Sequence, residues 1–291
     1  MDGNLINWDE CNVHVISYSL HYGVSAFEGI RFYETEKGTA VFRLNDHMKR
    51  LLESAKIVEM KVDYSEPDLV RAAKDVVSAN SMKSGYLRPI VFYGGGKLSI
   101  HAVGNAVNVA IAALPWGKYL AHESVKIMTS SFMRHHPKAL PMSAKLSGYY
   151  VNSVLAVQEA RKKGFDEALL LDYKGNVAEG PGENFFMVKK GILSTPSLGT
   201  ILPGITRDCI IQIAKDSEIK VQERSISLDE AKEADEAFFT GTAAEVTPIR
   251  QIDDKKIGDG SVGHVTTKLK DIYHDIVTGK NKKYAKWLDY V

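Results

Sequence analysis

The spacing of apolar residues changes part-way along the chain, and this change constrains the fold more than any other feature. Segments 45–60 and 65–80 repeat apolar residues every three or four positions, which predicts two helices. Beyond about residue 124, most apolar runs are short and bounded by turn residues, which predicts a meander of strands. We therefore expect two α+β domains, a small one over 1–115 and a large β-rich one over 124–291, joined by a connection over 116–123.

Several residues predict where individual elements begin. Asn45 and Ser65 stand before the two predicted helices and are expected to be their N-caps. Ser227 and Glu230 have the spacing of a capping box, which predicts a further helix start. Pro89 lies inside the strand-like run "GYLRPIVFYGGG". Because proline donates no backbone hydrogen bond, we expect this strand to lie at a sheet edge or to begin near Pro89.

Composition argues against several classes of function. Charged residues make up 25% of the chain and hydrophobic residues 44%, and the net charge of +1 gives no basic surplus for nucleic acid or an anionic membrane. Every apolar run is shorter than the roughly 18 residues of a membrane span, and the first ten residues lack the pattern of a signal peptide. The two cysteines are too few for a disulfide framework, and the nine histidines form no metal-binding pattern. We expect a cytoplasmic protein without a bound metal.

One lysine near the middle of the chain has unusual neighbours. In "LPMSAKLSGYY", Lys145 stands among small and apolar residues, with no acidic residue within five positions. Taken alone, the stretch favours a surface lysine in a loop, because most lysines are exposed. The alternative is an amine that is kept in a pocket for its chemistry.

Four glycine-containing stretches have the composition of ligand-binding loops. "YGGGKLS" departs from the P-loop pattern and "GPGENF" lacks the third glycine of a dinucleotide fingerprint, so both are interpreted as turns. In "LPGITRD", Ile205 and Thr206 follow a Pro-Gly turn, which predicts either an anion site at a helix start or an ordinary threonine N-cap. The small residues of "FTGTAAE" predict either a close backbone approach to a ligand or a tight turn.

Charged residues at three other places are candidates for binding. Glu179 in "AEGPGEN" is either a carboxylate for a ring nitrogen or a solvated loop acid. In "YLRP", the strand period places Tyr86 and Arg88 on one face. Either the two side chains bind a carboxylate there, or Arg88 extends along the surface with its charged end in water. Arg50 lies about 200° around its helix from Met48, which predicts a solvated face unless a second domain covers it.

These stretches occur together in the order found in one family. "HYGVSAFEGIRFY", "YLRP", "AKLSGYY", "EGPGENFF", "LPGITRD" and "TGTAAEVTPI" resemble the branched-chain amino acid aminotransferases, which are fold-type IV pyridoxal phosphate enzymes, and the resemblance runs from about Asn7 to the C-terminus. It implies the two-domain α+β fold of the D-amino acid aminotransferase type, with the active site at the domain interface. Six ordered motifs are more specific than any one of them, so the resemblance favours the ligand-binding interpretation of each.

The resemblance also implies which residues bind the cofactor, pyridoxal 5′-phosphate. Lys145 is expected to form a Schiff base with it and to shuttle the proton. Glu179 is expected to face the pyridine nitrogen, and Tyr150 the ring hydroxyl. The residues expected at the phosphate are Arg50, Ile205, Thr206 and Thr242.

The same resemblance implies the substrate contacts. Tyr86 and the backbone at Thr242 and Ala243 are expected to bind the substrate α-carboxylate. Arg88 is expected to bind the side-chain carboxylate of glutamate. The residues expected to form the apolar walls are Phe27, Gly29, Trp116, Tyr119 and Tyr150.

The implied assembly is a homodimer or a larger homo-oligomer in which Tyr22 of the partner subunit completes each site. Arg31 and the loop "GGGKLSI" are expected at the rim of the site. The implied reaction moves an amino group between L-leucine, L-isoleucine or L-valine and 2-oxoglutarate by a ping-pong mechanism. These small amino acids and 2-oxo acids are the only expected partners besides further copies of the chain.

Two alternatives stay open. D-amino acid aminotransferases and aminodeoxychorismate lyases share this fold and would share the lysine and the glutamate, whereas "YLRP", "TGTAAE" and Trp116 favour the branched-chain enzyme. A non-catalytic protein that binds a phosphate-containing ligand would have lost site residues, and none of the expected residues is missing from the sequence.

Overall fold

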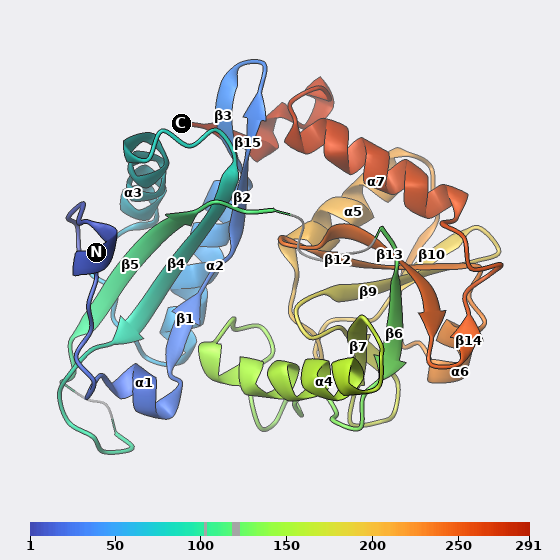
Figure 1. Cartoon of the computed structure of the whole chain (residues 1–291), viewed down its shortest axis with the longest axis horizontal. Helices are drawn as coiled ribbons and strands as arrows, with labels where there is room; N and C mark the ends of the chain where they lie inside the picture. The colour runs from blue at the N-terminus through green and yellow to red at the C-terminus, as the bar shows by residue number, and fades with distance from the viewer. Residues whose placement is uncertain (102–103, 118–122) are drawn as a thin grey trace. The chain divides into compact units, whose positions relative to one another are not determined.

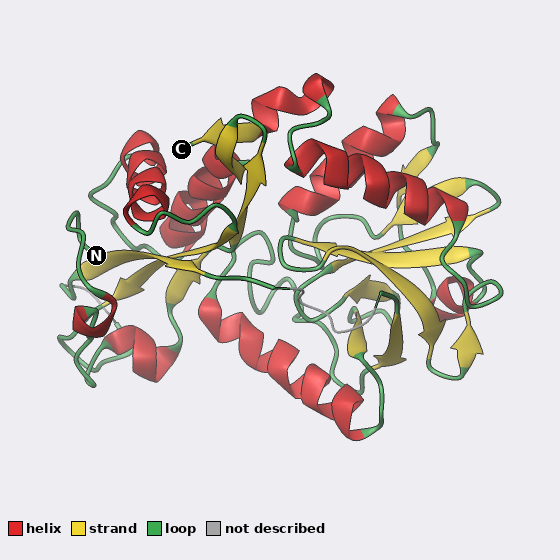
Figure 2. Ribbon diagram, turned by 45° about the horizontal axis from the view of Figure 1, so that its top comes forward, coloured by secondary structure: helices red, strands yellow, loops and turns green. Residues whose placement is uncertain are grey.

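The computed structural model describes residues 1–101, 104–117 and 123–291. The chain forms two compact units, and each contains both helices and strands (Figures 1 and 2). Unit 1 consists of Met1–Gly117, Ala144–Tyr149 and Val277–Val291, and unit 2 consists of Lys118–Ser143 and Tyr150–Ile276.

Unit 1 is built on a six-stranded sheet in which neighbouring strands are antiparallel. The strands follow the order β1-β4-β2-β3-β15, and β5 pairs with β4. They are β1 (Ser25–Phe27), β2 (Ile30–Thr35), β3 (Gly38–Phe42), β4 (Gly85–Tyr93), β5 (Val107–Leu114) and β15 (Leu288–Tyr290). The helical segments are η1 (Trp8–Glu10), α1 (Tyr18–Tyr22), α2 (Leu44–Ile57), α3 (Glu66–Ala79), η2 (Ser147–Tyr149) and η3 (Lys282–Trp287).

The two helices predicted near the N-terminus are present as α2 and α3, which pack against each other. Ser65 is the N-cap of α3, as predicted, and forms a reciprocal capping box with Asp68. The prediction that Asn45 caps α2 is wrong. The chain enters this helix earlier, at Arg43, whose φ of 52° lies in the left-handed region.

Strand β4 lies in the interior of the sheet, which corrects the prediction made for Pro89. Residues 85–87 pair with β2, residues 90–92 pair with β1, and β5 pairs along the strand as well. Pro89 falls between the segment that pairs with β2 and the segment that pairs with β1. Its carbonyl oxygen accepts a hydrogen bond from the N–H of Glu28 at 2.9 Å. The N–H and C=O positions of one strand residue face the same side, so the missing N–H of Pro89 faces an interruption between β2 and β1.

Unit 2 contains a nine-stranded sheet, part of which closes into a ring. In the ring β9, β12, β13, β6, β7 and β8 are neighbours in that order, and β8 pairs back with β9 through Glu179 and Asn184. The strands are β6 (Val125–Thr129), β7 (Glu167–Leu171), β8 (Val177–Glu179), β9 (Asn184–Lys189), β10 (Ile192–Thr195), β11 (Val221–Glu223), β12 (Glu236–Gly241), β13 (Glu245–Ile252) and β14 (Lys255–Lys256). The helices are α4 (Tyr150–Lys162), α5 (Ile205–Asp216), α6 (Leu228–Lys232) and α7 (His264–Val277). Ser227 caps α6 by accepting the N–H of Glu230, as the capping-box spacing predicts.

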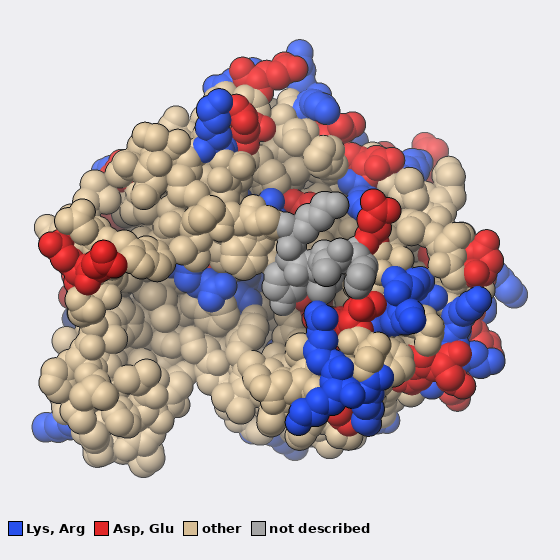
Figure 3. Space-filling view, in the orientation of Figure 1, with Lys and Arg blue, Asp and Glu red and all other residues tan. Residues whose placement is uncertain are grey.

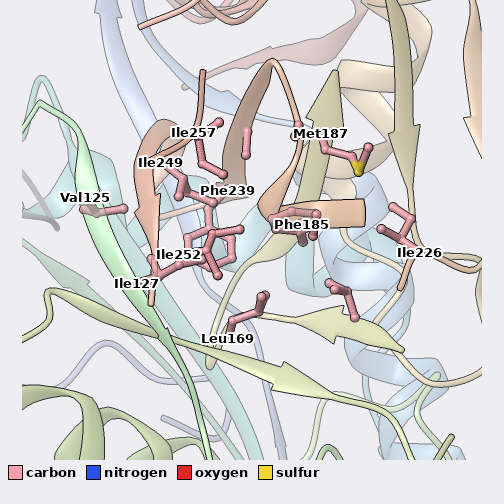
Figure 4. Packing of buried hydrophobic residues seen from close by; sticks show 14 of the residues in the cluster. Val125, Ile127, Leu169, Phe185, Met187, Ile226, Phe239, Ile249, Ile252 and Ile257 are labelled. Atoms are coloured by element: carbon pink, nitrogen blue, oxygen red, sulfur yellow. The ribbon is translucent and has the colours of Figure 1, made fainter. Parts of the chain in front are cut away.

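The inner face of this ring forms the apolar core of unit 2. Figure 4 shows its side chains pointing toward one another from successive strands, among them Leu169 of β7, Phe185 of β9 and Phe239 of β12. Successive side chains of a strand point to opposite faces, so Ala168 and Leu170 lie on the other face of β7, where they pack with residues of α4. The ring thereby fixes the position of β8, which carries Glu179.

The two units differ from the predicted linear division at two places. The segment Ala144–Tyr149, which carries Lys145, belongs to unit 1, where Ala26 and Leu146 form a β-bridge. Val277–Val291 also belongs to unit 1, because β15 pairs with β3. The prediction assigned both segments to the large domain, since a pattern read along the chain does not reveal pairings between distant residues. The predicted connection over 116–123 lies partly outside the described residues.

No helix among the described residues is long and apolar enough to cross a membrane. In the same part of the chain, no three histidine, cysteine or acidic side chains are grouped so that they could hold a metal ion. On the face in Figure 3, basic and acidic side chains lie beside one another over unit 2, whereas the surface around α1 is mostly uncharged.

Glu167 at the start of β7 is a buried acid that makes stability depend on pH. Glu167 is 3% exposed, and burial raises the pKa of its carboxyl group to about 7 from an ordinary value of 4.5. An acid whose pKa is raised by folding loses stabilisation as pH increases from the unfolded pKa through the folded one. Glu167→Gln is therefore expected to raise the free energy of unfolding at pH 8 by up to ~3 kcal/mol, with little effect near pH 4.5. Denaturant titrations at the two pH values would measure this, and equal effects at both would contradict it.

Candidate functional site

The segment that carries Lys145 is held to unit 1 by its main chain. The N–H of Lys145 donates to Ser54 Oγ of α2 at 3.0 Å, and its carbonyl oxygen accepts the N–H of Phe27 at 3.2 Å. The Nζ atom lies 4.8 Å from the centroid of the Phe27 ring, which is a cation–π geometry. Lys145 is half-buried and its amine lies against an aromatic ring, so it is not the exposed loop lysine that the stretch alone favours.

Arg50 of α2 forms a two-point ion pair with Glu28. Arg50 Nε lies 2.6 Å from Glu28 Oε1, and Arg50 Nη2 lies 2.8 Å from Oε2. His47 Nδ1 contacts the same Oε2 at 2.6 Å. Burial by itself would raise the pKa of Glu28, but Arg50 and His47 hold it well below its usual range. Burial lowers the pKa of His47, against the opposing effect of Glu28, so His47 is a neutral donor at neutral pH.

The helical spacing alone predicted a solvated face for Arg50, and this is wrong. The Arg50 side chain is only 11% exposed, because the loop between β1 and β2 places Glu28 against it. Glu28 comes from the same unit, so no second domain is needed to cover this face. Arg50 is therefore a largely buried residue of unit 1 and not a solvated one.

Aromatic rings and Arg88 gather beside Phe27 in the same unit. The Tyr86 and Trp116 rings stack with centroids 4.3 Å apart. The Arg88 guanidinium carbon lies 4.9 Å from the Phe27 centroid and 5.3 Å from the Tyr86 centroid, and Arg88 Nη2 donates to the Tyr86 hydroxyl at 3.2 Å. Arg88 Nε is buried without a hydrogen-bond partner in the described chain. A buried donor of this kind favours a ligand that brings an acceptor, such as a carboxylate.

Gly29 allows this arrangement because it has no side chain. A Cβ at position 29 would lie 1.7 Å from the Tyr86 hydroxyl oxygen, so any larger residue would displace Tyr86. Arg31 of β2 instead stacks near Tyr33, with 5.1 Å from its guanidinium carbon to the ring centroid. Tyr22 of α1 is 40% exposed, and Tyr119 lies outside the described residues.

Glu179 of β8 is the centre of a hydrogen-bond network in unit 2. Its Oε1 accepts from Arg134 Nε at 2.6 Å, and its Oε2 accepts from Asn184 Nδ2 at 3.0 Å. The N–H of Leu202 lies 3.3 and 3.1 Å from the two oxygens. Glu179 is 3% exposed, which excludes the interpretation as a solvated loop acid. Arg134 thus places a buried positive charge beside this carboxylate.

Helix α5 begins close to this network without a side-chain cap. Its N-cap is Gly204, so the interpretation of Thr206 as an ordinary N-cap is wrong. A Cβ at Gly204 would lie 1.9 Å from Asn184 Oδ1, which explains why glycine occupies the position. The N–H groups of the first helical turn, at Ile205 and Thr206, have no acceptor within the helix and are suited to an anion.

The remaining predicted residues of unit 2 lie at element ends. Thr242 and Ala243 are half-buried in the loop between β12 and β13, as the strand–loop–strand prediction has it. A Cβ at the adjacent Gly241 would lie 3.2 Å from Gly182 O, so backbone segments approach closely here. Tyr150 opens α4 and is half-buried.

Comparison with known proteins identifies the family. The profile of the family Amino-transferase class IV matches residues 25–252, which is most of the chain. The chain belongs to the class IV aminotransferases.

Relatives of this class IV aminotransferase match it over almost its whole length. The branched-chain-amino-acid aminotransferase of Pseudomonas aeruginosa is 47% identical over 290 residues, covering 98% of this chain and 94% of that protein. The crystal structure of a branched-chain aminotransferase from Thermoproteus uzoniensis with norvaline has a TM-score of 0.96 at 46% identity, covering 99% and 97% of the two chains. The crystal structure of the T.th. branched-chain amino acid aminotransferase complexed with N-(5′-phosphopyridoxyl)-L-glutamate has a TM-score of 0.95 at 44% identity, covering 98% and 95%. These solved structures confirm the predicted fold-type IV class of the chain.

The structure of this class IV aminotransferase groups the predicted residues into two sets. Phe27, Gly29, Arg50, Tyr86, Arg88, Trp116 and Lys145 lie in unit 1, and Tyr150, Glu179, Ile205, Thr206, Thr242 and Ala243 lie in unit 2. Sequence reasoning missed the residues that hold them, namely Glu28, His47, Ser54, Arg134 and Asn184. Glu28 and Asn184 stand inside quoted motifs, "FEGI" and "GENFF", so their place in those motifs was the available signal.

Proposed function

We propose that the protein is a branched-chain amino acid aminotransferase that transfers the amino group between L-leucine, L-isoleucine or L-valine and 2-oxoglutarate with pyridoxal 5′-phosphate. The observation that carries the proposal is Lys145, whose main chain is fixed by Phe27 and Ser54 and whose amine lies over the Phe27 ring. The names of the near-full-length relatives support the substrate class.

The residues present fit pyridoxal phosphate. Its phosphate suits the cation of Arg50, the uncapped start of α5 and the hydroxyl of Thr242. Its ring nitrogen suits Glu179, whose charge is supported by Arg134. Its aldehyde suits a primary amine, which Lys145 provides.

When bound, pyridoxal phosphate supplies an electron sink that weakens the bond from substrate Cα to hydrogen and carries the amino group between the two halves of a ping-pong reaction. Lys145 Nζ would take the proton from Cα of the amino acid as a general base and would then act as the general acid that gives it up. Glu179 would accept a hydrogen bond from the ring nitrogen and keep that nitrogen protonated. Arg50 and the first turn of α5 would hold the phosphate and thereby limit the movement of the cofactor.

The aromatic wall and Arg88 account for two kinds of substrate. Phe27, Tyr86 and Trp116 present apolar surface to a branched side chain. One methylene in such a pocket is worth only ~1–3 kcal/mol, so we expect all three branched-chain amino acids to react. Glutamate must use the same pocket in the other half-reaction, and Arg88 would bind its side-chain carboxylate. Tyr86 and the backbone at Thr242 and Ala243 would bind the α-carboxylate of either substrate.

We include assembly and location in the proposal. Large apolar side chains of the N-terminal segment are exposed, and they are suited to an interface with a second copy in a homodimer or larger homo-oligomer. The most exposed are Leu5, Trp8, Val15 and Leu20, at 65–70%. Tyr22 from that copy would complete each site. Cys11 and Cys209 are both free thiols, which suits a reducing, cytoplasmic location.

The test is transamination of L-leucine and of D-alanine with 2-oxoglutarate by the purified protein, together with its absorbance spectrum. We expect turnover of L-leucine and a yellow protein. Turnover of the D-substrate alone would favour a D-amino acid aminotransferase. Lyase activity on aminodeoxychorismate without transamination would favour that enzyme. A colourless protein that gains no absorbance with added pyridoxal phosphate would contradict the cofactor assignment.

A further inference from the structure

Helix α2 carries a polar stripe that reaches two parts of the site in unit 1. His47, Arg50 and Ser54 stand three and four positions apart, which places them on one helix face. His47 and Arg50 both contact the Glu28 carboxylate, and Ser54 Oγ accepts the N–H of Lys145. One helix therefore fixes both the Glu28 carboxylate and the segment that carries the reactive lysine.

We propose that Glu28 is a positioning residue that sets the orientation of the Arg50 guanidinium for binding the cofactor phosphate. The proposal rests on the proposed function for the identity of the cofactor and adds a role for Glu28. Glu28 itself would touch neither the phosphate nor the reacting atoms.

The geometry of the ion pair supports this role. Two contacts, Nε to Oε1 at 2.6 Å and Nη2 to Oε2 at 2.8 Å, fix the plane of the guanidinium group. A planar guanidinium held along one edge directs its other N–H donors away from the carboxylate. An arginine side chain carries about 2 kcal/mol of rotamer entropy, so holding Arg50 in advance reduces the cost of ordering it when the phosphate binds.

The two partners differ in burial, and this difference distinguishes a positioning role for Glu28 from an ordinary ion pair of the core. The Glu28 side chain is 0% exposed, whereas the Arg50 side chain is 11% exposed. Glu28 is also anchored by His47 at 2.6 Å and by its own N–H on Pro89 O at 2.9 Å. The carboxylate is thus the fully buried, fixed member of the pair, and the Arg50 side chain is the partly exposed member.

A second account of Glu28 predicts the opposite result. If Glu28 served only to balance the charge of Arg50, its negative charge would oppose the binding of a phosphate anion. Removal of that charge would then tighten binding. If Glu28 positions Arg50, its removal or shortening loosens the guanidinium and weakens binding. The sign of the change in phosphate-dependent affinity therefore distinguishes the two.

The experiment compares pyridoxal 5′-phosphate with pyridoxal, which lacks the phosphate. Dissociation constants for both are measured by absorbance on the cofactor-free forms of the wild type, Glu28→Gln and Glu28→Asp. Glu28→Gln keeps the shape and removes the charge, whereas Glu28→Asp keeps the charge and shortens the reach. We expect both variants to bind pyridoxal phosphate about 10- to 100-fold more weakly, by analogy with the loss of a residue that orients a metal ligand. Their affinity for pyridoxal should stay within about twofold.

Two control variants and one spectroscopic measurement accompany this comparison. Glu167→Gln removes a buried carboxylate of unit 2 and should change neither affinity. Ser54→Ala removes the contact to the Lys145 main chain and should change both affinities to the same extent. The ³¹P resonance of bound pyridoxal phosphate should shift in both Glu28 variants and stay unchanged in Glu167→Gln.

Several outcomes would overturn the proposal. Glu28→Gln could bind pyridoxal phosphate as tightly as the wild type or more tightly, with Glu28→Asp unchanged. This result would show that Glu28 only balances the charge of Arg50. Equal weakening for pyridoxal would show general damage to the site instead of a phosphate effect. If Glu28→Gln does not fold, the affinities of Glu28→Asp for pyridoxal phosphate and for pyridoxal distinguish the two accounts. A wild type that binds pyridoxal phosphate but does not transaminate L-leucine would overturn the proposed function alone. A wild type that binds no pyridoxal phosphate would overturn both.

Discussion

Replacement of Lys145 by alanine is expected to lower kcat for L-leucine by about 10⁴-fold or more. In the proposed mechanism, the variant loses both the amine that attaches the cofactor and the group that moves the proton at Cα. Proton transfer by a positioned side chain by itself raises a reaction rate by about 10²–10⁴-fold. Phe27 and Ser54, the two residues that hold the segment, carry no amine that could replace that of Lys145. Steady-state transamination with 2-oxoglutarate measures kcat, and the absorbance of the bound cofactor should change as well.

Lys138→Ala is the matched control for this prediction. Lys138 is an exposed lysine a few residues earlier in the chain, and its replacement should leave activity unchanged. A small primary amine such as methylamine should restore part of the activity of Lys145→Ala but should not affect Lys138→Ala. Activity of Lys145→Ala within about tenfold of the wild type would remove Lys145 from the proton transfer.

Replacement of Arg88 by alanine is expected to lower kcat/KM for glutamate by about 10²–10³-fold, with a much smaller loss for leucine. Loss of one member of a buried, hydrogen-bonded charge pair costs ~2–5 kcal/mol, and only glutamate brings a side-chain carboxylate to form that pair. The Arg88 guanidinium is already held by Phe27, Tyr86 and the Tyr86 hydroxyl, and its Nε lacks a partner in the described part of the chain. A carboxylate would satisfy this donor.

Two further variants sharpen the test of Arg88. Arg88→Lys keeps the positive charge but loses the planar guanidinium group that can donate two parallel hydrogen bonds. Compared with Arg88→Ala, it should recover part of the glutamate activity and little of the Tyr86 contact. Arg71→Ala removes an exposed arginine of the same unit, which pairs only with its helix neighbour Asp68 in the described structure, and should affect neither substrate. Equal losses for glutamate and leucine in Arg88→Ala would show that Arg88 supports the site as a whole instead of recognising the dicarboxylate.

Local signals were sufficient for much of the fold. Ser65 and Ser227 are predictable as helix starts because a cap depends on residues three positions away, which the sequence displays directly. Asn45 was a wrong choice of cap because Arg43 adopts a left-handed conformation that its residue type does not indicate. Pro89 was misplaced at an edge because the interruption between β2 and β1 exists only after two distant strands have paired with β4.

The candidate site was predictable as a set of motif residues but not as a structure. Arg50 looked solvated on a helical wheel, because Glu28 reaches it from a loop 22 positions earlier in the chain. Glu179 was ambiguous for the same reason, since Arg134 and Asn184 meet it only after the ring of strands has closed. Buried polar partners of this kind are specified by tertiary contacts, and one sequence does not contain them as a periodic pattern.

The pairing of β15 with β3 has a consequence for synthesis of the protein on the ribosome. Leu288 pairs with Phe42, so β3 must wait for nearly the whole chain to be translated before its partner exists. At about 5–20 residues per second, that delay is on the order of ten to fifty seconds. Throughout this interval β3 presents an unpaired edge, which is a site for misassembly with other nascent chains and for chaperone binding. Translation of the last strand therefore sets the earliest moment at which the lysine-bearing unit is complete.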